Sequence, residues 1–184
     1  MLTKVISGGQ TGADIAGLIA AKECGLETGG TAPKKFMTEN GSNLDLKNIY
    51  HLVAVGGYKS RTIKNVCDSD GTIAFIVHNG TGGTSKTIGY CKYGKWIDYF
   101  DTDNDGFKPV LVIDAHHMEL KSMEATCSKI IQWLNENQIK VLNIAGHRQS
   151  TAFQKPFYDS EPYDYQQRVV DILVSVFNEF INEN

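Results

Sequence analysis

The 184-residue sequence predicts an α/β fold with a single doubly wound, mostly parallel sheet. Short apolar runs alternate with segments whose apolar residues recur at helical spacing, as in strand–helix–strand units. The run from Thr72 to Val77 is almost continuously apolar, which is typical of a parallel strand covered on both faces. A chain of this length can bury one good core and is short for two, so we expect a single domain over residues 1–184.

The composition is that of a globular protein and argues against a large charged partner. Hydrophobic residues make up 41%, charged residues 21%, and the net charge is −3. We therefore expect neither a nucleic-acid partner nor a membrane surface. No apolar stretch approaches bilayer length and the first strand begins close to Met1, so we expect a cytoplasmic protein. The four cysteines lack C-x-x-C spacing, which favours reduced, partly buried thiols over disulfides or zinc.

The first predicted unit is a strand, a glycine-rich turn and a helix. Val5 and Ile6 form the apolar run, and the turn from Ser7 to Asp14 contains three glycines before small and apolar residues recur. Glycines let a ligand approach the main chain, and the first amide groups of the helix attract anions. Thr11 and Asp14 also have the spacing of a capping box, so the turn is predicted both to cap the helix and to face a ligand.

The next segment is predicted to be mostly connecting chain. Gly25 is placed as the left-handed residue that ends the first helix. An extended piece, Thr28 to Ala32, then leads to Lys34, which could meet a phosphate group or lie in a solvated basic loop. Residues 37–50 are polar and lack periodicity, so we expect a surface loop.

A second unit follows over residues 51–68. A short strand ends at the pair Gly56-Gly57, and a helix from Ser60 to Asp68 is predicted with Ser60 as its cap. Its inner face would carry Ile63, Val66 and Cys67, while Arg61 and Asn65 share the other face at i, i+4 spacing.

The strand over residues 72–77 ends in the richest glycine loop, residues 78–84, and a helix is predicted from Ser85 to Tyr99. The aromatic residues of this helix favour core or subunit interface over a base-stacking platform. Residues 101–106 imitate the first half of a calcium-binding loop. Position twelve of that loop is Val112 rather than glutamate, so we expect an acidic connector.

The remaining chain completes the alternation. A strand over residues 110–113 ends at Asp114, an amphipathic helix spans residues 121–137, and a last strand over residues 141–144 leads to Gly146-His147-Arg148 in a loop. The terminal helix carries two apolar stripes. The second stripe, Val170, Val174 and Ile181, predicts an oligomer interface, with a homodimer or homotetramer expected.

The ends of the predicted strands carry most of the candidate chemistry. Ligands of such sheets bind beyond the carboxyl ends of the strands, where five loops, four of them with glycine, should converge on one cleft for a flat or phosphorylated ligand. Arg61 and Arg148 are predicted to be its main side-chain cations, because a guanidinium can hold a phosphate through two parallel hydrogen bonds. The alternative is structural, with Arg61 paired to Asp68 or Asp70, or with Arg148 capping a helix. The spacing of His78, His116 and His147 does not support a metal site.

Seven segments within residues 6–150 match one known family in order: Ser7–Asp14, Thr28–Gly30 with Pro33-Lys34, Tyr58 with Arg61-Thr62, Asn65-Val66, Asp68–Thr72, Thr81–Thr84, and Leu142–Gly146 with Arg148 and Ser150. On them the chain resembles the molybdenum carrier family, a branch of the SLOG superfamily of Rossmann-like proteins related to LOG enzymes. The resemblance implies one SLOG-like ligand-binding domain in a homo-oligomer. Its cargo would be a phosphorylated pterin, the molybdenum cofactor, or a nucleotide-like molecule, and no resident cofactor is required.

LOG-type phosphoribohydrolases carry a catalytic glutamate in a P-G-G-x-G-T-x-x-E motif, whereas Thr87 stands at that position here. Binding without turnover is therefore the leading hypothesis. The alternatives are a sensor or sequestering protein for an NAD-derived or cyclic nucleotide signal, in defence or counter-defence, and a LOG-like nucleotide N-glycosidase. The predicted ligand contacts are Gly8, Gly9, Gln10, Thr11, Asp14, Lys34, Arg61, Asn65, Gly80, Thr81, Gly82, Gly83, Thr84 and Arg148.

Overall fold

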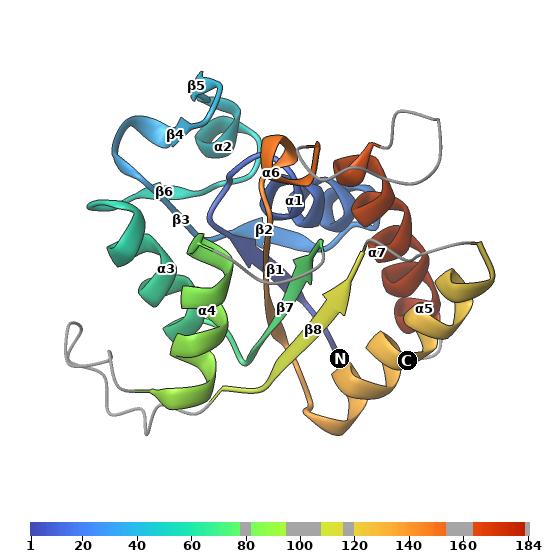
Figure 1. Cartoon of the computed structure of the whole chain (residues 1–184). Helices are drawn as coiled ribbons and strands as arrows, with labels where there is room; N and C mark the ends of the chain where they lie inside the picture. Colours follow the sequence, from blue (N-terminus) through green and yellow to red (C-terminus); the bar gives the residue numbers. More distant parts are fainter. Residues whose placement is uncertain (78–81, 95–107, 116–119, 154–163, 183–184) are drawn as a thin grey trace.

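A computed structural model describes residues 1–77, 82–94, 108–115, 120–153 and 164–182. Its centre is a five-stranded sheet in the order β2-β1-β9-β7-β8, and every neighbouring pair is parallel (Figure 1). The strands are β2 (Glu27–Gly29), β1 (Lys4–Ser7), β9 (Val141–Gly146), β7 (Gly71–Ile76) and β8 (Val110–Asp114). The predicted fold class, α/β with a mostly parallel sheet, is confirmed.

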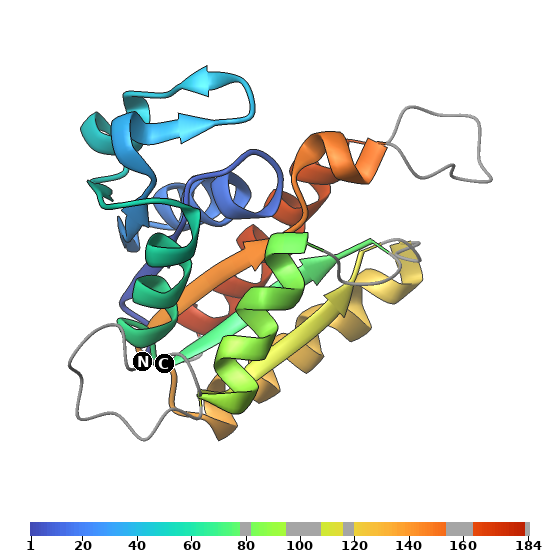
Figure 2. The same ribbon diagram turned by 60° about the vertical axis from the view of Figure 1, so that its left-hand side comes forward.

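Helices cover both faces of this sheet (Figure 2). One face packs against α1 (Ala13–Glu23), α5 (Leu120–Glu136) and α7 (Tyr165–Asn182), and the other carries α3 (Tyr58–Cys67) and α4 (Gly82–Tyr93). The main hydrophobic core lies on the α1, α5 and α7 side, where Phe75 and Phe177 are completely buried. Among the described residues, no helix combines the length and the apolar character that crossing a bilayer requires.

A smaller unit lies beside α1 and has its own core, formed by Leu18, Ala32, Leu46 and Leu52. The prediction of a surface loop over residues 37–50 is wrong, because this segment forms two short strands and a helix. Leu46 is its one buried hydrophobic residue, so no periodic pattern marks these elements in the sequence. The strand predicted before Gly56-Gly57 pairs only within this unit and does not join the central sheet. The elements are β3 (Thr31–Ala32), a 3₁₀ turn (Lys34–Phe36), β4 (Met37–Thr38), β5 (Gly41–Ser42), α2 (Asp45–Asn48) and β6 (Val53–Ala54).

The first helix begins differently from the prediction. Gly12 is the N-cap residue, with φ 78° and ψ −129°, and no side chain caps the helix. The Thr11 hydroxyl instead donates to Glu39, and the carboxylate of Asp14 accepts the amide of Gln10 at 3.3 Å. The predicted capping box is therefore wrong. The left-handed Gly25, with φ 73°, is confirmed as the residue that ends this helix.

Other helices also differ from the prediction. Helix α3 starts at Tyr58 after Gly57, without a Ser60 cap, and α4 starts at Gly82. A short helix, α6 (Gln149–Phe153), occupies part of the predicted loop after β9. The aromatic residues beyond position 94 and the acidic segment 101–106 lie outside the described residues.

The second apolar stripe of α7 is buried within the chain. Val170 is 4% exposed and belongs to the main core, and Val174 and Ile181 pack against that core. Because α7 contacts both α1 and α5, this stripe needs no partner subunit. Val174 and Ile181 nevertheless keep some exposed surface, so both the oligomer interface and the oligomeric state stay predictions.

Candidate functional site

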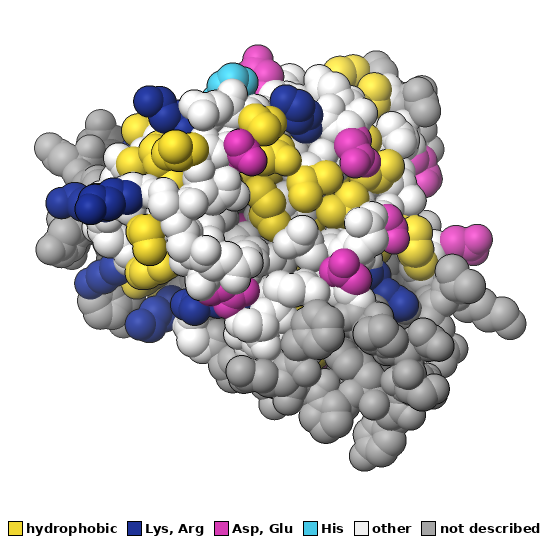
Figure 3. Space-filling model, turned by 90° about the horizontal axis from the view of Figure 1, so that it is seen from above, with side chains coloured by type: hydrophobic (Ala, Val, Ile, Leu, Met, Phe, Trp, Pro, Cys, Tyr) yellow, Lys and Arg dark blue, Asp and Glu magenta, His cyan; other side chains and the backbone are white. Residues whose placement is uncertain are grey.

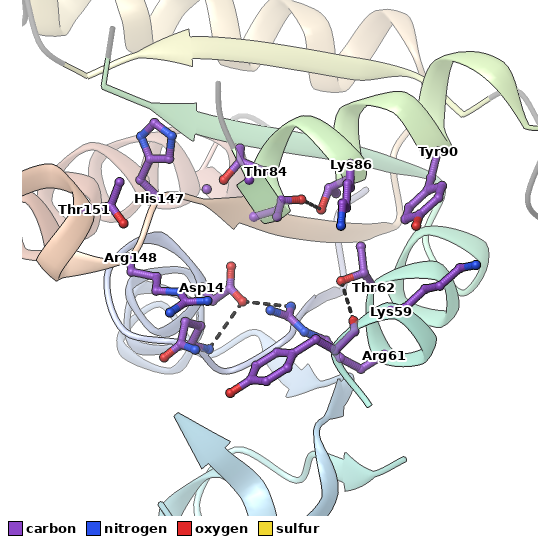
Figure 4. Close-up of a pocket in the computed structure, with 17 residues that line it drawn as sticks. Asp14, Lys59, Arg61, Thr62, Thr84, Lys86, Tyr90, His147, Arg148 and Thr151 are labelled. Atoms are coloured by element: carbon purple, nitrogen blue, oxygen red, sulfur yellow. Dashed lines mark hydrogen bonds and ion pairs between the residues drawn. The ribbon is translucent and has the colours of Figure 1, made fainter. Parts of the chain in front are cut away.

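A cavity of about 390 Å³ opens beyond the carboxyl ends of β1 and β9, between α3 and α4 (Figure 4). Four chain segments supply its walls: the β1–α1 turn, α3, the first turns of α4, and the chain from β9 into α6. The lining residues are Gln10, Asp14, Tyr58, Lys59, Arg61, Thr62, Gly82, Gly83, Thr84, Lys86, Thr87, Tyr90, Ala145, Gly146, His147, Arg148 and Thr151.

An ion pair between Arg61 and Asp14 forms one wall. Arg61 Nη1 lies 3.0 Å from Asp14 Oδ2, and both side chains are largely buried. Burial raises the pKa of the Asp14 carboxyl above its ordinary value of 3.8, and the attraction of Arg61 offsets this effect only in part. The structural alternative named Asp68 or Asp70 as the partner of Arg61. Asp68 pairs instead with Lys64, so the partner of Arg61 is Asp14, which itself lines the cavity.

Two further cations enter the cavity from opposite walls. Arg148 comes from the β9–α6 connection and Lys86 from α4, and both side chains are exposed (Figure 4). Neither makes a hydrogen bond or an ion pair with any residue that the structure describes. Arg148 is close enough to Asp14 and Glu39 to lower the pKa of both carboxyls. These two cations are therefore available to an anionic ligand.

The N-terminus of α4 faces the same space. No backbone acceptor is found for the amide groups of Gly83 and Thr84 among the described residues, as expected for the first turn of a helix. A β-carbon on Gly82 or Gly83 would meet nothing within 4 Å, so the backbone is open there. The amides of the first helical turn, the helix dipole and two available cations together form an environment that stabilises a phosphate-sized anion.

Seven of the predicted ligand contacts line this cavity: Gln10, Asp14, Arg61, Gly82, Gly83, Thr84 and Arg148. Gly80 and Thr81 lie outside the described residues. Gly8, Gly9, Thr11, Lys34 and Asn65 do not line it, for reasons that differ from residue to residue.

Asn65 and Gly9 serve the fold. The side-chain amide of Asn65 is buried, accepts the Thr31 amide at 2.8 Å and donates to the Thr31 carbonyl at 3.1 Å. Gly9 has φ 69°, and a β-carbon there would lie 2.7 Å from Leu46 Cδ1. Both positions are therefore fixed by contacts with the smaller unit, and their contact with a ligand stays a prediction.

The other three residues, Thr11, Lys34 and Gly8, lie outside the cavity lining, each for a different reason. The Thr11 hydroxyl donates to the Glu39 carboxylate, which is bound as well by the Ser150 hydroxyl. Lys34 is exposed in the 3₁₀ turn, away from the cavity lining. Gly8 makes room for the Arg61 guanidinium, so it acts on the cavity through Arg61.

Sequence reasoning missed several cavity residues, and one pattern could have found some of them. Gly83, Lys86 and Tyr90 are spaced by three and four residues, which places them on one face of α4. His147 is buried, and its Nδ1 accepts the Val77 amide at 2.9 Å, so this ring is held by the backbone. No cluster of three metal-binding side chains occurs in the described parts of the chain.

The charged side chains are distributed unevenly over the upper face of the molecule. Seen from above, lysine and arginine side chains gather mainly on the left of the molecule, the side of α3 and α4, and carboxylates lie mainly at the centre and right (Figure 3). A chain with a net charge of −3 thus places cations on the side where the cavity opens.

Comparisons with known proteins agree with this architecture. The family profile described as "Circularly permutated YpsA SLOG family" matches residues 5–156. The crystal structure of the "Putative molybdenum carrier protein" from Syntrophus aciditrophicus superimposes with a TM-score of 0.70 at 32% sequence identity. The match covers 96% of this chain and 94% of that one. No curated protein sequence matches the chain.

Proposed function

The chain belongs to the circularly permutated YpsA SLOG family, and from this premise we propose that it is a non-catalytic protein that binds and carries a phosphate-bearing small molecule. One observation carries the proposal. Lys86 and Arg148, whose side chains form no hydrogen bond or ion pair with the described residues, enter the same cavity as the first turn of α4. Such a cavity would hold a phosphate through main-chain amides and through guanidinium and ammonium donors.

Two cargoes fit this chemistry. The name of the Syntrophus protein, a relative that matches almost the whole chain, favours the molybdenum cofactor, a phosphorylated pterin. The other is an NAD-derived or cyclic nucleotide signal that the protein would sense or sequester. Both carry phosphate and an aromatic heterocycle, so the cations of the cavity suit either of them.

Mass spectrometry of small molecules released by denaturing freshly purified protein tests the proposal. We expect a phosphorus-containing compound in near-stoichiometric amount. A pterin accompanied by molybdenum in elemental analysis would identify a cofactor carrier, and a nucleotide without the metal would identify a signal-binding protein. The absence of any phosphorylated compound, together with no binding of added phosphate esters, would contradict the proposal.

The Asp14 carboxyl favours a second candidate function, hydrolysis of a nucleotide N-glycosidic bond. Asp14 is 4% exposed, lines the cavity and has a raised pKa, which are common properties of catalytic acids and bases. Against this function, Thr87 stands where LOG enzymes have their catalytic glutamate. The Thr87 hydroxyl donates to the Gly83 carbonyl at 3.1 Å. Incubation with nucleoside 5′-monophosphates, followed by chromatography for free base, separates the two functions. Only an enzyme would release base, and Asp14→Asn should then stop the release.

A further inference from the structure

A second cavity adjoins the first along the outer side of α4. It has a volume of about 310 Å³ and is lined by Lys59, Lys86, Gly89, Tyr90 and Tyr93. Three of these residues, Lys59, Lys86 and Tyr90, also line the larger cavity. The two cavities are therefore neighbours that share part of their walls.

The shared residues follow one face of α4. Gly83, Lys86, Tyr90 and Tyr93 are separated by three, four and three residues, which keeps them in one row along the helix. With a rise of about 1.5 Å per residue, Tyr90 lies roughly 10 Å along the helix axis from Gly83. Lys86 stands between them, on the side that faces the cavity (Figure 4).

The two tyrosines on this row are not core residues. Tyr93 is 63% exposed and Tyr90 is half-buried, so aromatic surface remains open beside the cations. The small residue Gly89 lies in the wall of the same cavity. Aromatic side chains in such a position can stack on a flat heterocycle whatever its ring type, because every nucleobase has a π face.

We propose that this row of residues on α4 binds a phosphate and an aromatic ring of the same ligand. The phosphate would lie at the first turn of α4, and the heterocycle would stack against Tyr90. The inference rests on the proposed binding of a phosphate-bearing molecule and narrows its class. The ligand would carry both a phosphate and an aromatic heterocycle, as a nucleotide or a pterin phosphate does. A sugar phosphate or inorganic phosphate fills only one end of the row.

Titration calorimetry with four probes tests this assignment: inorganic phosphate, ribose 5-phosphate, AMP and GMP. The two nucleotides should bind at least about tenfold more tightly than ribose 5-phosphate, the usual scale of one stacked base. Tyr90→Leu should remove this advantage and leave ribose 5-phosphate binding unchanged. Tyr90→Phe, the matched control, keeps the ring and should keep the advantage. Thermal melts of both variants check that the fold is intact.

Two results would overturn the inference while leaving the proposed function in place. In the first, AMP and GMP bind no more tightly than ribose 5-phosphate. In the second, Tyr90→Leu weakens all phosphate probes equally, which would make Tyr90 a structural residue. If none of the four probes binds, the failure lies with the phosphate site itself and therefore with the proposed function.

Discussion

The guanidinium group of Arg61 fills the space that a side chain at Gly8 would need, since a β-carbon there would lie 1.4 Å from Arg61 Nη1. The same Nη1 atom binds Asp14 Oδ2 at 3.0 Å. Gly8 therefore allows the protein's own cation to reach the buried carboxylate at the edge of the cavity. Gly8, which the sequence suggests as a direct ligand contact, influences the cavity through the position of Arg61.

Gly8→Ala should weaken both phosphate binding and the fold. The three atoms nearest to the new methyl group all belong to the flexible end of Arg61, which must move away from Asp14. We expect ribose 5-phosphate to bind about tenfold more weakly, the effect of disturbing one charge-assisted hydrogen bond, and the fold to lose up to about 2 kcal/mol because the buried Asp14 carboxylate loses its partner. Calorimetry and a thermal melt of the same sample measure the two effects. A large loss of stability with unchanged affinity would show that Gly8 serves the fold alone.

Gly12→Ala should destabilise the protein strongly. Gly12 has φ 78°, and a β-carbon would lie 2.4 Å from the His147 carbonyl oxygen, a backbone atom that cannot rotate away. We expect a loss of about 3 kcal/mol in the free energy of unfolding, from backbone strain and the clash together. Gly83→Ala is the control because its β-carbon would meet nothing within 4 Å, and its stability should change by less than about 0.5 kcal/mol. Equal stabilities in urea unfolding would refute this account of the turn.

Arg61→Ala and Arg148→Ala should separate stability from binding. Arg61 is the charged partner of a buried carboxylate, so its removal should cost roughly 2 kcal/mol of stability at neutral pH as well as affinity. Arg148 is exposed and has no partner among the described residues, so Arg148→Ala should lower affinity with an unchanged melting temperature. If Arg148→Ala melts well below the parent protein, Arg148 has a structural role.

Glu39→Gln should change how stability depends on acid. Burial alone would raise the pKa of the Glu39 carboxyl, but hydrogen bonds from Ser150 and Thr11 hold it below the ordinary value of 4.5. A lowered pKa in the fold stabilises the protein at pH values above 4.5, and this contribution is lost as the pH falls through the folded-state pKa. Urea unfolding of the parent protein should therefore lose more stability between about pH 5 and pH 3 than the variant does. Parallel pH profiles would contradict the role of Glu39.

The fold was predictable because its signals are local. The apolar run of β7 reflects a strand that is covered on both faces. The small residues of α1 and the amphipathic pattern of α5 reflect helices that each bury one face. The spacing of apolar residues therefore follows directly from which side chains are buried. Even the second stripe of α7 was recognised as apolar. Periodicity shows that a face is buried and does not show which element covers it, and in this chain the main core covers part of the stripe.

The site was predictable in outline and not in its pairings. Glycines at strand ends identified the edge of the sheet where the cavity lies, but each glycine there has its own cause. A side chain at Gly9 would meet Leu46 and one at Gly12 would meet His147, whereas Gly57, Gly82 and Gly83 have open space around them. The pairing of Arg61 with Asp14 joins residues 47 positions apart, so no local pattern reveals it. The row on α4 was visible in the spacing, but its tyrosines were assigned to core or interface because exposure cannot be read from the sequence.

The phosphorus content of the small-molecule fraction released from purified protein tests the central claim most directly. Three proteins are compared: the parent, Arg148→Glu, which reverses a cavity cation, and Lys47→Glu, which reverses an exposed lysine outside the cavity lining. We predict at least one phosphorus atom per parent chain, the same for Lys47→Glu, and almost none for Arg148→Glu, because a carboxylate in the cavity repels an anionic ligand. A parent-level phosphorus content in folded Arg148→Glu would contradict the claim that this cavity holds the phosphate.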